Sequence, residues 1–128
     1  MKALTIRQPW AHAILHLGKN IENRKWPPPE RLIGKYIAIH AGKGLDRESG
    51  LDVAEHELVR GAIVGIARIG KVVEDSRSRS FDGPLGWTLH DVRVLPKPIR
   101  RNGILGLWNV TPAELRKIRA AFPDLDLE

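Results

Sequence analysis

Apolar and polar residues recur along this chain in short segments, a pattern that predicts several strands and few helices. Near the N-terminus, Trp10, Ala13 and Leu17 follow Pro9 at the spacing of one helix face, and Gly18 is suited to end that helix. Elsewhere, short runs rich in β-branched and apolar residues are bounded by turn residues. Strands are therefore predicted at residues 3–6, 21–24, 35–41, 61–73, 87–94 and 104–110.

Two further helices are predicted after residue 45. One covers residues 46–58. The other begins at Thr111, which can cap it, with Pro112 in the first position and Glu114 able to complete a capping box. The acidic residues 123–128 are expected to be frayed.

Glycines within the longest predicted strand indicate how the strands assemble. Gly65 and Gly70 lie inside 61–73 and predict bulges or a bend, as a small barrel requires. A polar loop, 74–85, follows, and helices do not alternate regularly with strands, which disfavours a doubly wound sheet. We expect a single α+β domain over residues 1–128, built as a small mixed β-barrel of five to six strands flanked by short helices.

Composition restricts the class of protein. The chain has 128 residues, 42% of them hydrophobic, enough for one domain with a real core. No apolar run approaches a membrane span, the start lacks the apolar region of a signal peptide, and cysteine is absent. We therefore expect a cytoplasmic protein without a membrane partner. A net charge of +6 favours a polyanion such as nucleic acid, although a basic surface without a partner would give the same value.

The closest group of charged side chains with possible catalytic roles begins just after the first predicted helix and extends into the strand at 21–24. It contains Lys19, Glu22 and Arg24, which fall within six residues. Side chains alternate along a strand, so Glu22 and Arg24 face one way, and Lys19 at the preceding corner can reach the same side. Two cations and a carboxylate can transfer protons or hold a planar polar ligand. The alternative is an ion pair with only a structural role.

Four other residues are candidates for binding a ligand. Trp26 and Trp87 lie beside predicted loops and could stack on a base. His40 ends a strand near the expected barrel mouth, where a half-buried structural histidine is the alternative. Lys43 lies between two glycines in a predicted turn and could contact phosphate.

Basic residues in predicted loops could line a groove for a phosphate backbone, or could serve only solubility. No metal or organic cofactor is expected, because His12 and His16 share a helix face without an evident third ligand. The basic residues considered for the groove are Lys25, Arg31, Lys35, Arg77, Arg79, Arg100 and Arg101.

The chain resembles the ASCH domain, a superfamily with a PUA-like β-barrel. In the superfamily signature, a glycine is followed by a lysine, a glutamate and an arginine; Lys19, Glu22 and Arg24 match, and the glycine is shifted by one position to Gly18. The segments that carry the resemblance are residues 4–11, 18–26, 34–41, 83–87 and 103–108.

The resemblance implies a role with RNA or nucleosides. Similar bacterial ASCH proteins hydrolyse N4-acetylcytidine, using the lysine that matches Lys19. They carry threonine where this chain has Glu22, and they take a glutamate from later in the chain, for which Asp82 and Glu74 are the candidates here. The implied function is an amidohydrolase acting on N4-acylcytidine or a related pyrimidine nucleoside. The alternatives are a module that binds single-stranded RNA and a metal-assisted ribonuclease.

Overall fold

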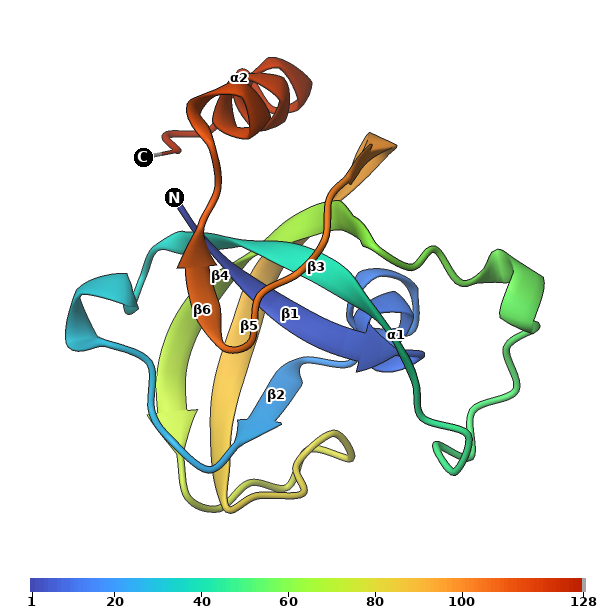
Figure 1. Ribbon diagram of the computed structural model, residues 1–128. Helices are drawn as coiled ribbons and strands as arrows, with labels where there is room; N and C mark the ends of the chain where they lie inside the picture. Colours follow the sequence, from blue (N-terminus) through green and yellow to red (C-terminus); the bar gives the residue numbers. More distant parts are fainter. Residues whose placement is uncertain (128) are drawn as a thin grey trace.

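The computed structural model describes residues 1–127 and contains six strands and two α-helices (Figure 1). In chain order, the elements are β1 (Lys2–Gln8), α1 (Trp10–His16), β2 (Ile21–Arg24), β3 (Tyr36–Leu45), β4 (Ala62–Val73), β5 (Leu85–Arg100), β6 (Leu107–Asn109) and α2 (Pro112–Ala121), with short 3₁₀ turns at Glu30–Leu32 and Glu55–Glu57.

All six strands join one mixed sheet in the order β2-β5-β4-β3-β1-β6. Only β1 and β3 pair in parallel, with Thr5 opposite His40, and the other neighbours are antiparallel. The sheet curls strongly (Figure 1), but within residues 1–127 no strand ladder joins β2 to β6. The α+β prediction is confirmed, whereas the expected barrel is an open sheet with two edge strands.

The long hairpin of β4 and β5 lies between β2 and β3 in the sheet. Its register shifts at three places, between Ile63 and Gly65, between Ile66 and Arg68, and between Ile69 and Val72. A Cβ atom added at Gly65 would lie 2.4 Å from the Arg93 carbonyl oxygen, so this position admits no side chain. The irregularities that the glycines predicted are therefore present.

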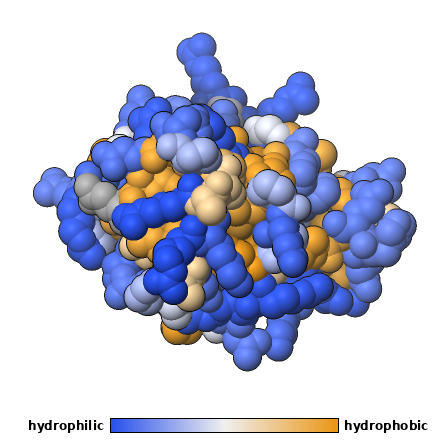
Figure 2. Space-filling view, turned by 90° about the horizontal axis from the view of Figure 1, so that it is seen from above, coloured by the Kyte–Doolittle hydropathy of each residue, from blue (hydrophilic) through white to orange (hydrophobic). Residues whose placement is uncertain are grey.

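Two apolar cores lie on the two faces of the sheet. The first packs Leu4, Ile39 and Trp87 with Ile14 of α1. The second packs Ile63 and Ile66 with the buried stripe of α2, including Ile118. Figure 2 shows the end of the molecule that carries α2, where some apolar surface remains visible between hydrophilic side chains.

The capping of α2 agrees with the sequence pattern. The Thr111 side chain accepts a hydrogen bond from the Glu114 amide, and the Glu114 carboxylate accepts one from the Thr111 amide. The tail was predicted wrongly, because Leu127 is buried and its carbonyl accepts two hydrogen bonds from Arg119. Residue 128 lies outside the described residues.

The predicted helix over residues 46–58 is also wrong, apart from the single 3₁₀ turn. The Asp46 carboxylate accepts a hydrogen bond from the Glu48 amide, and the Ser49 hydroxyl accepts one from the Leu51 amide. Such local bonds compete with helix formation, and Gly50 adopts a positive φ of 75°. None of the helices described over residues 1–127 is both long and apolar enough to cross a membrane.

Candidate active site

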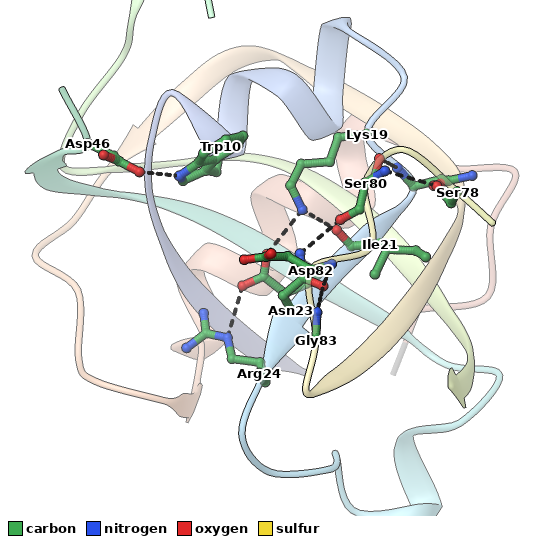
Figure 3. A network of polar contacts seen from close by, with 12 residues as sticks. Trp10, Lys19, Ile21, Asn23, Arg24, Asp46, Ser78, Ser80, Asp82 and Gly83 are labelled. Atoms are coloured by element: carbon green, nitrogen blue, oxygen red, sulfur yellow. Dashed lines mark hydrogen bonds and ion pairs between the residues drawn. The ribbon is translucent and has the colours of Figure 1, made fainter. Parts of the chain in front are cut away.

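The three motif side chains converge where the turn after α1 enters β2 (Figure 3). Glu22 Oε2 lies 2.9 Å from Arg24 Nε, and Glu22 Oε1 lies 3.9 Å from Lys19 Nζ. Lys19 also donates a hydrogen bond to the Ile21 carbonyl. The carboxylate therefore lies between two cations, as the alternation along β2 predicted.

Arg24 extends the site across the gap in the sheet. Its Nη2 donates to the Thr5 carbonyl of β1 over 3.0 Å, so a side chain joins β2 to β1 where no strand ladder does. The Lys19 ammonium lies 5.8 Å from the ring centre of Trp10, whose indole N–H donates to Asp46 over 3.0 Å. Neither Thr5 nor Trp10 was a sequence-based candidate, because their contacts depend on the tertiary fold.

Burial controls the protonation of Lys19 and Glu22, whose side chains are only 11% and 9% exposed. Desolvation lowers the pKa of Lys19, and Arg24 adds to this, while Glu22 and Asp82 favour the ammonium. Desolvation likewise raises the pKa of Glu22, against the opposing effect of Arg24 and Lys19. Both shifts favour the uncharged forms, so the site can exchange a proton nearer neutral pH than free side chains would.

A polar loop, residues 74–84, brings Asp82 toward this cluster. Asn23 holds the loop with three hydrogen bonds: its Nδ2 donates to the Ser80 carbonyl over 2.9 Å, and its Oδ1 accepts from the amides of Asp82 and Gly83. Asp82 lies close enough for its charge to act on Lys19. Asn23 lies within the motif, but the alternation along β2 turns it away from Glu22, so sequence reasoning did not include it.

The two candidate tryptophans occupy different environments. Trp26 is 37% exposed and lies next to Arg24, with 5.8 Å between the guanidinium carbon and the ring centre. Trp87 is fully buried within β5, where its indole N–H donates to the Trp26 carbonyl over 3.1 Å. The expectation that Trp87 stacks on a ligand is therefore wrong, because its ring is buried in the core. The rings of Trp87 and Trp26 make an edge-to-face contact, with 5.1 Å between their centres.

None of the contacts described over residues 1–127 joins His40 or Lys43 directly to Lys19, Glu22 or Arg24. His40 is fully buried, donates from Nε2 to the Arg101 carbonyl over 2.6 Å, and has a pKa lowered by burial. Within residues 1–127, its Nδ1 has no hydrogen-bond partner. Lys43 lies within β3 and not in the predicted turn, and it is exposed.

The proposed basic groove is only partly available. Arg101 is held over the Trp108 ring at 4.1 Å and lies 3.4 Å from Glu114, so its charge is already partnered. Arg77 and Arg79 are exposed in the loop that carries Asp82, and Arg100 ends β5.

One hollow in the surface is not lined by any of the motif residues. It measures about 570 Å³, and its lining includes Lys2, Arg31 and Tyr36. Over residues 1–127, no three histidine, cysteine, aspartate or glutamate side chains gather as a metal site would require. The motif is thus a small, largely buried polar cluster, and its residues do not line that hollow.

The fold and the cluster define a class of protein that comparison with known sequences identifies. The sequence model of the ASCH domain matches residues 4–107, so this chain belongs to the ASCH domain family. That family, with its PUA-like fold, is associated with RNA binding and with hydrolase activity.

Solved structures agree on the fold. An ASCH protein from Zymomonas mobilis has a TM-score of 0.59 at 17% identity and covers 93% of each chain. A single-residue variant of that protein has a TM-score of 0.61 at 16% identity, covering 93% of this chain and 96% of the other. No curated protein matches this sequence.

Proposed function

We propose that this protein is an amidohydrolase that removes the acyl group from N4-acylcytidine or a related modified pyrimidine nucleoside. The observation that carries the proposal is the buried cluster of Lys19, Glu22 and Arg24, in which desolvation lowers the pKa of the lysine. A lysine with a lowered pKa can act as a general base near neutral pH. Membership of the ASCH domain family adds support, because Lys19 matches the lysine of the superfamily signature.

The reaction needs a water molecule, a base and a donor for the leaving group. Uncharged Lys19 takes a proton from water while the water oxygen forms a bond to the acyl carbonyl carbon. Arg24 stabilises the negative charge that develops on the carbonyl oxygen. When the bond from carbon to N4 breaks, the Lys19 ammonium returns its proton to N4, leaving the cytosine amine and a carboxylic acid.

Glu22 and Asp82 set the state of that lysine. Glu22, held by Arg24 at 2.9 Å, orients the ammonium and stabilises it after proton uptake. Of the two candidates for the later carboxylate, Asp82 and Glu74, Asp82 is supported by the action of its charge on Lys19 from the loop. Trp26, exposed beside Arg24, is suited to stack on the pyrimidine.

The test is hydrolysis of N4-acetylcytidine, followed by ultraviolet absorbance, with wild type, Lys19→Ala and Lys25→Ala. Lys25 is an exposed lysine close in sequence, and its variant controls for loss of one positive charge. We expect turnover in wild type and in Lys25→Ala, and a loss of about 100-fold or more in Lys19→Ala. Equal turnover in all three, or none in wild type, would contradict the proposal.

A second candidate is binding of single-stranded RNA, favoured by the net charge of +6 and by the position of the motif outside the hollow of about 570 Å³. A polymer can approach a shallow site that would not enclose a free nucleoside. RNA affinity must fall steeply with salt if phosphates are bound. An affinity that is equal at low and high salt would exclude this candidate.

A further inference from the structure

The loop between β5 and β6, residues 101–106, carries the most exposed apolar side chains of the described chain. Leu105 is 95% exposed and Ile104 is 54% exposed. Water contact at this scale is unfavourable for leucine, by about 25 cal/mol for each Å² left unburied. Two adjacent apolar side chains this exposed at a loop tip form a candidate contact site for a ligand.

This loop is fastened to the sheet below it. His40 Nε2 donates to the Arg101 carbonyl over 2.6 Å, and Thr5 Oγ1 donates to the Ile104 carbonyl over 3.0 Å. Trp108 in turn donates to Thr5 Oγ1 over 3.0 Å. The loop therefore presents Leu105 from a fixed backbone, and binding there would not have to order it first.

Three cations gather where this loop leaves β5. Arg100 Nη1 donates to the Arg60 carbonyl over 3.3 Å, and Arg60 Nη1 donates to the Lys43 carbonyl over 3.2 Å. The stem of Lys43 lies beside Gly61, since a Cβ atom there would be 3.5 Å from Lys43 Cε. We call Lys43, Arg60 and Arg100 the basic cluster.

The guanidinium groups of Arg60 and Arg100 donate to backbone carbonyls and not to carboxylates. None of the ion pairs described over residues 1–127 includes any of its three side chains. Like charges held together repel one another, and an anion that binds among them relieves that repulsion.

The basic cluster and the loop tip are linked to the candidate active site through Thr5. Arg100 directly precedes the loop, and the loop is fastened by Thr5. The carbonyl of the same Thr5 accepts the hydrogen bond from Arg24. A ligand that spans all three must combine repeated negative charges with flat apolar groups.

We propose that the basic cluster and the Ile104–Leu105 tip bind single-stranded RNA, with phosphates at the cluster and an unstacked base against Leu105. RNA combines phosphates with bases that can pack against the apolar tip. An acidic peptide or a simple polyanion could bind the basic cluster but would leave the tip exposed. This proposal rests on the RNA-binding candidate above. It assigns the protein surface that would hold the RNA strand beside Arg24.

The test measures fluorescence anisotropy of a labelled single-stranded RNA of about 12 nucleotides, a length within known site sizes. The variants are Lys43→Gln/Arg100→Gln and Leu105→Ser. The matched control is Arg116→Gln/Lys117→Gln, which removes the same charge from exposed positions of α2. Each lost phosphate contact reduces the salt slope by about 0.7, so the double variant should bind about 25-fold more weakly at about 0.1 M salt.

Leu105→Ser should weaken binding several-fold without changing the salt slope, because it removes an apolar contact and no charge. Equal losses in the cluster variant and the α2 control would overturn the assignment of this surface, as would wild-type affinity in both test variants. Displacement of RNA by polyglutamate at equal charge concentration would indicate an acidic partner instead. If wild type binds no RNA at all, the RNA-binding candidate itself fails, whatever the outcome for N4-acetylcytidine.

Discussion

Lys19 is the residue on which the proposed chemistry depends. Two opposing influences act on its proton: burial favours the uncharged amine, and the neighbouring carboxylates favour the ammonium. Among those carboxylates Glu22 acts most strongly, from 3.9 Å. The balance between them sets the pH at which the lysine can serve as a base.

Replacing Glu22 with glutamine should therefore move the pH dependence of hydrolysis. Without the carboxylate, the pKa of Lys19 falls further, so the uncharged amine appears at lower pH and the rising limb of kcat/KM shifts downward. The measurement is kcat/KM for N4-acetylcytidine from about pH 5 to about pH 10. Glu30→Gln, an exposed control, should leave the profile in place. A shift of the Glu22→Gln limb to higher pH would exclude Lys19 as the base.

Among the connecting elements, the loop of residues 74–84 is held mainly by one side chain of β2, that of Asn23. The three hydrogen bonds of Asn23 fasten the segment that carries Asp82, and Ser78 adds a bond to Asn20 over 2.7 Å. This explains how an exposed polar loop can hold a carboxylate near Lys19.

Asn23→Ala should release this loop. Each hydrogen bond contributes about 1 kcal/mol, so losing three should make cleavage by trypsin after the exposed Arg77 and Arg79 about tenfold faster or more. The assay is limited proteolysis followed by mass spectrometry, with Asn102→Ala as the control at an exposed asparagine in a different loop. Cleavage at the wild-type rate would mean that Asn23 does not fasten the loop.

What the sequence could predict depended on the range of the interactions involved. The strand at 21–24 and the cap at Thr111 rest on neighbours in sequence, and both predictions agree with the structure. The helix expected at 46–58 failed because side chains within that segment bind its own backbone. The loop attachment joins Asn23 to Ser80 across 57 positions, which no local pattern encodes.

At the scale of the whole molecule, α2 is part of the core although it follows the family segment. The ASCH match ends at residue 107, whereas Ile118 of α2 is 0% exposed and packs with Ile63 and Ile66. The second core is therefore covered by residues outside the matched segment.

Ile118→Ala should destabilise the whole domain by about 2–5 kcal/mol, because it removes a fully buried side chain and leaves a cavity. Urea unfolding followed by tryptophan fluorescence measures this change. Lys117→Ala, on the exposed side of the same helix, should change stability by less than about 0.5 kcal/mol. A loss below about 1 kcal/mol for Ile118→Ala would mean that α2 is not an integral part of the core.

Thr5 joins the beginning of the chain to its end. Its hydroxyl donates a hydrogen bond to Ile104, 99 positions away, and accepts one from Trp108, 103 positions away. Its carbonyl accepts a hydrogen bond from Arg24. During synthesis the chain leaves the ribosome N-terminus first, so these contacts form only after residue 108 has emerged. A nascent chain already carries Lys19, Glu22 and Arg24, yet the surroundings of these residues are completed last. Products of premature termination before residue 104 accordingly retain the motif without its finished setting.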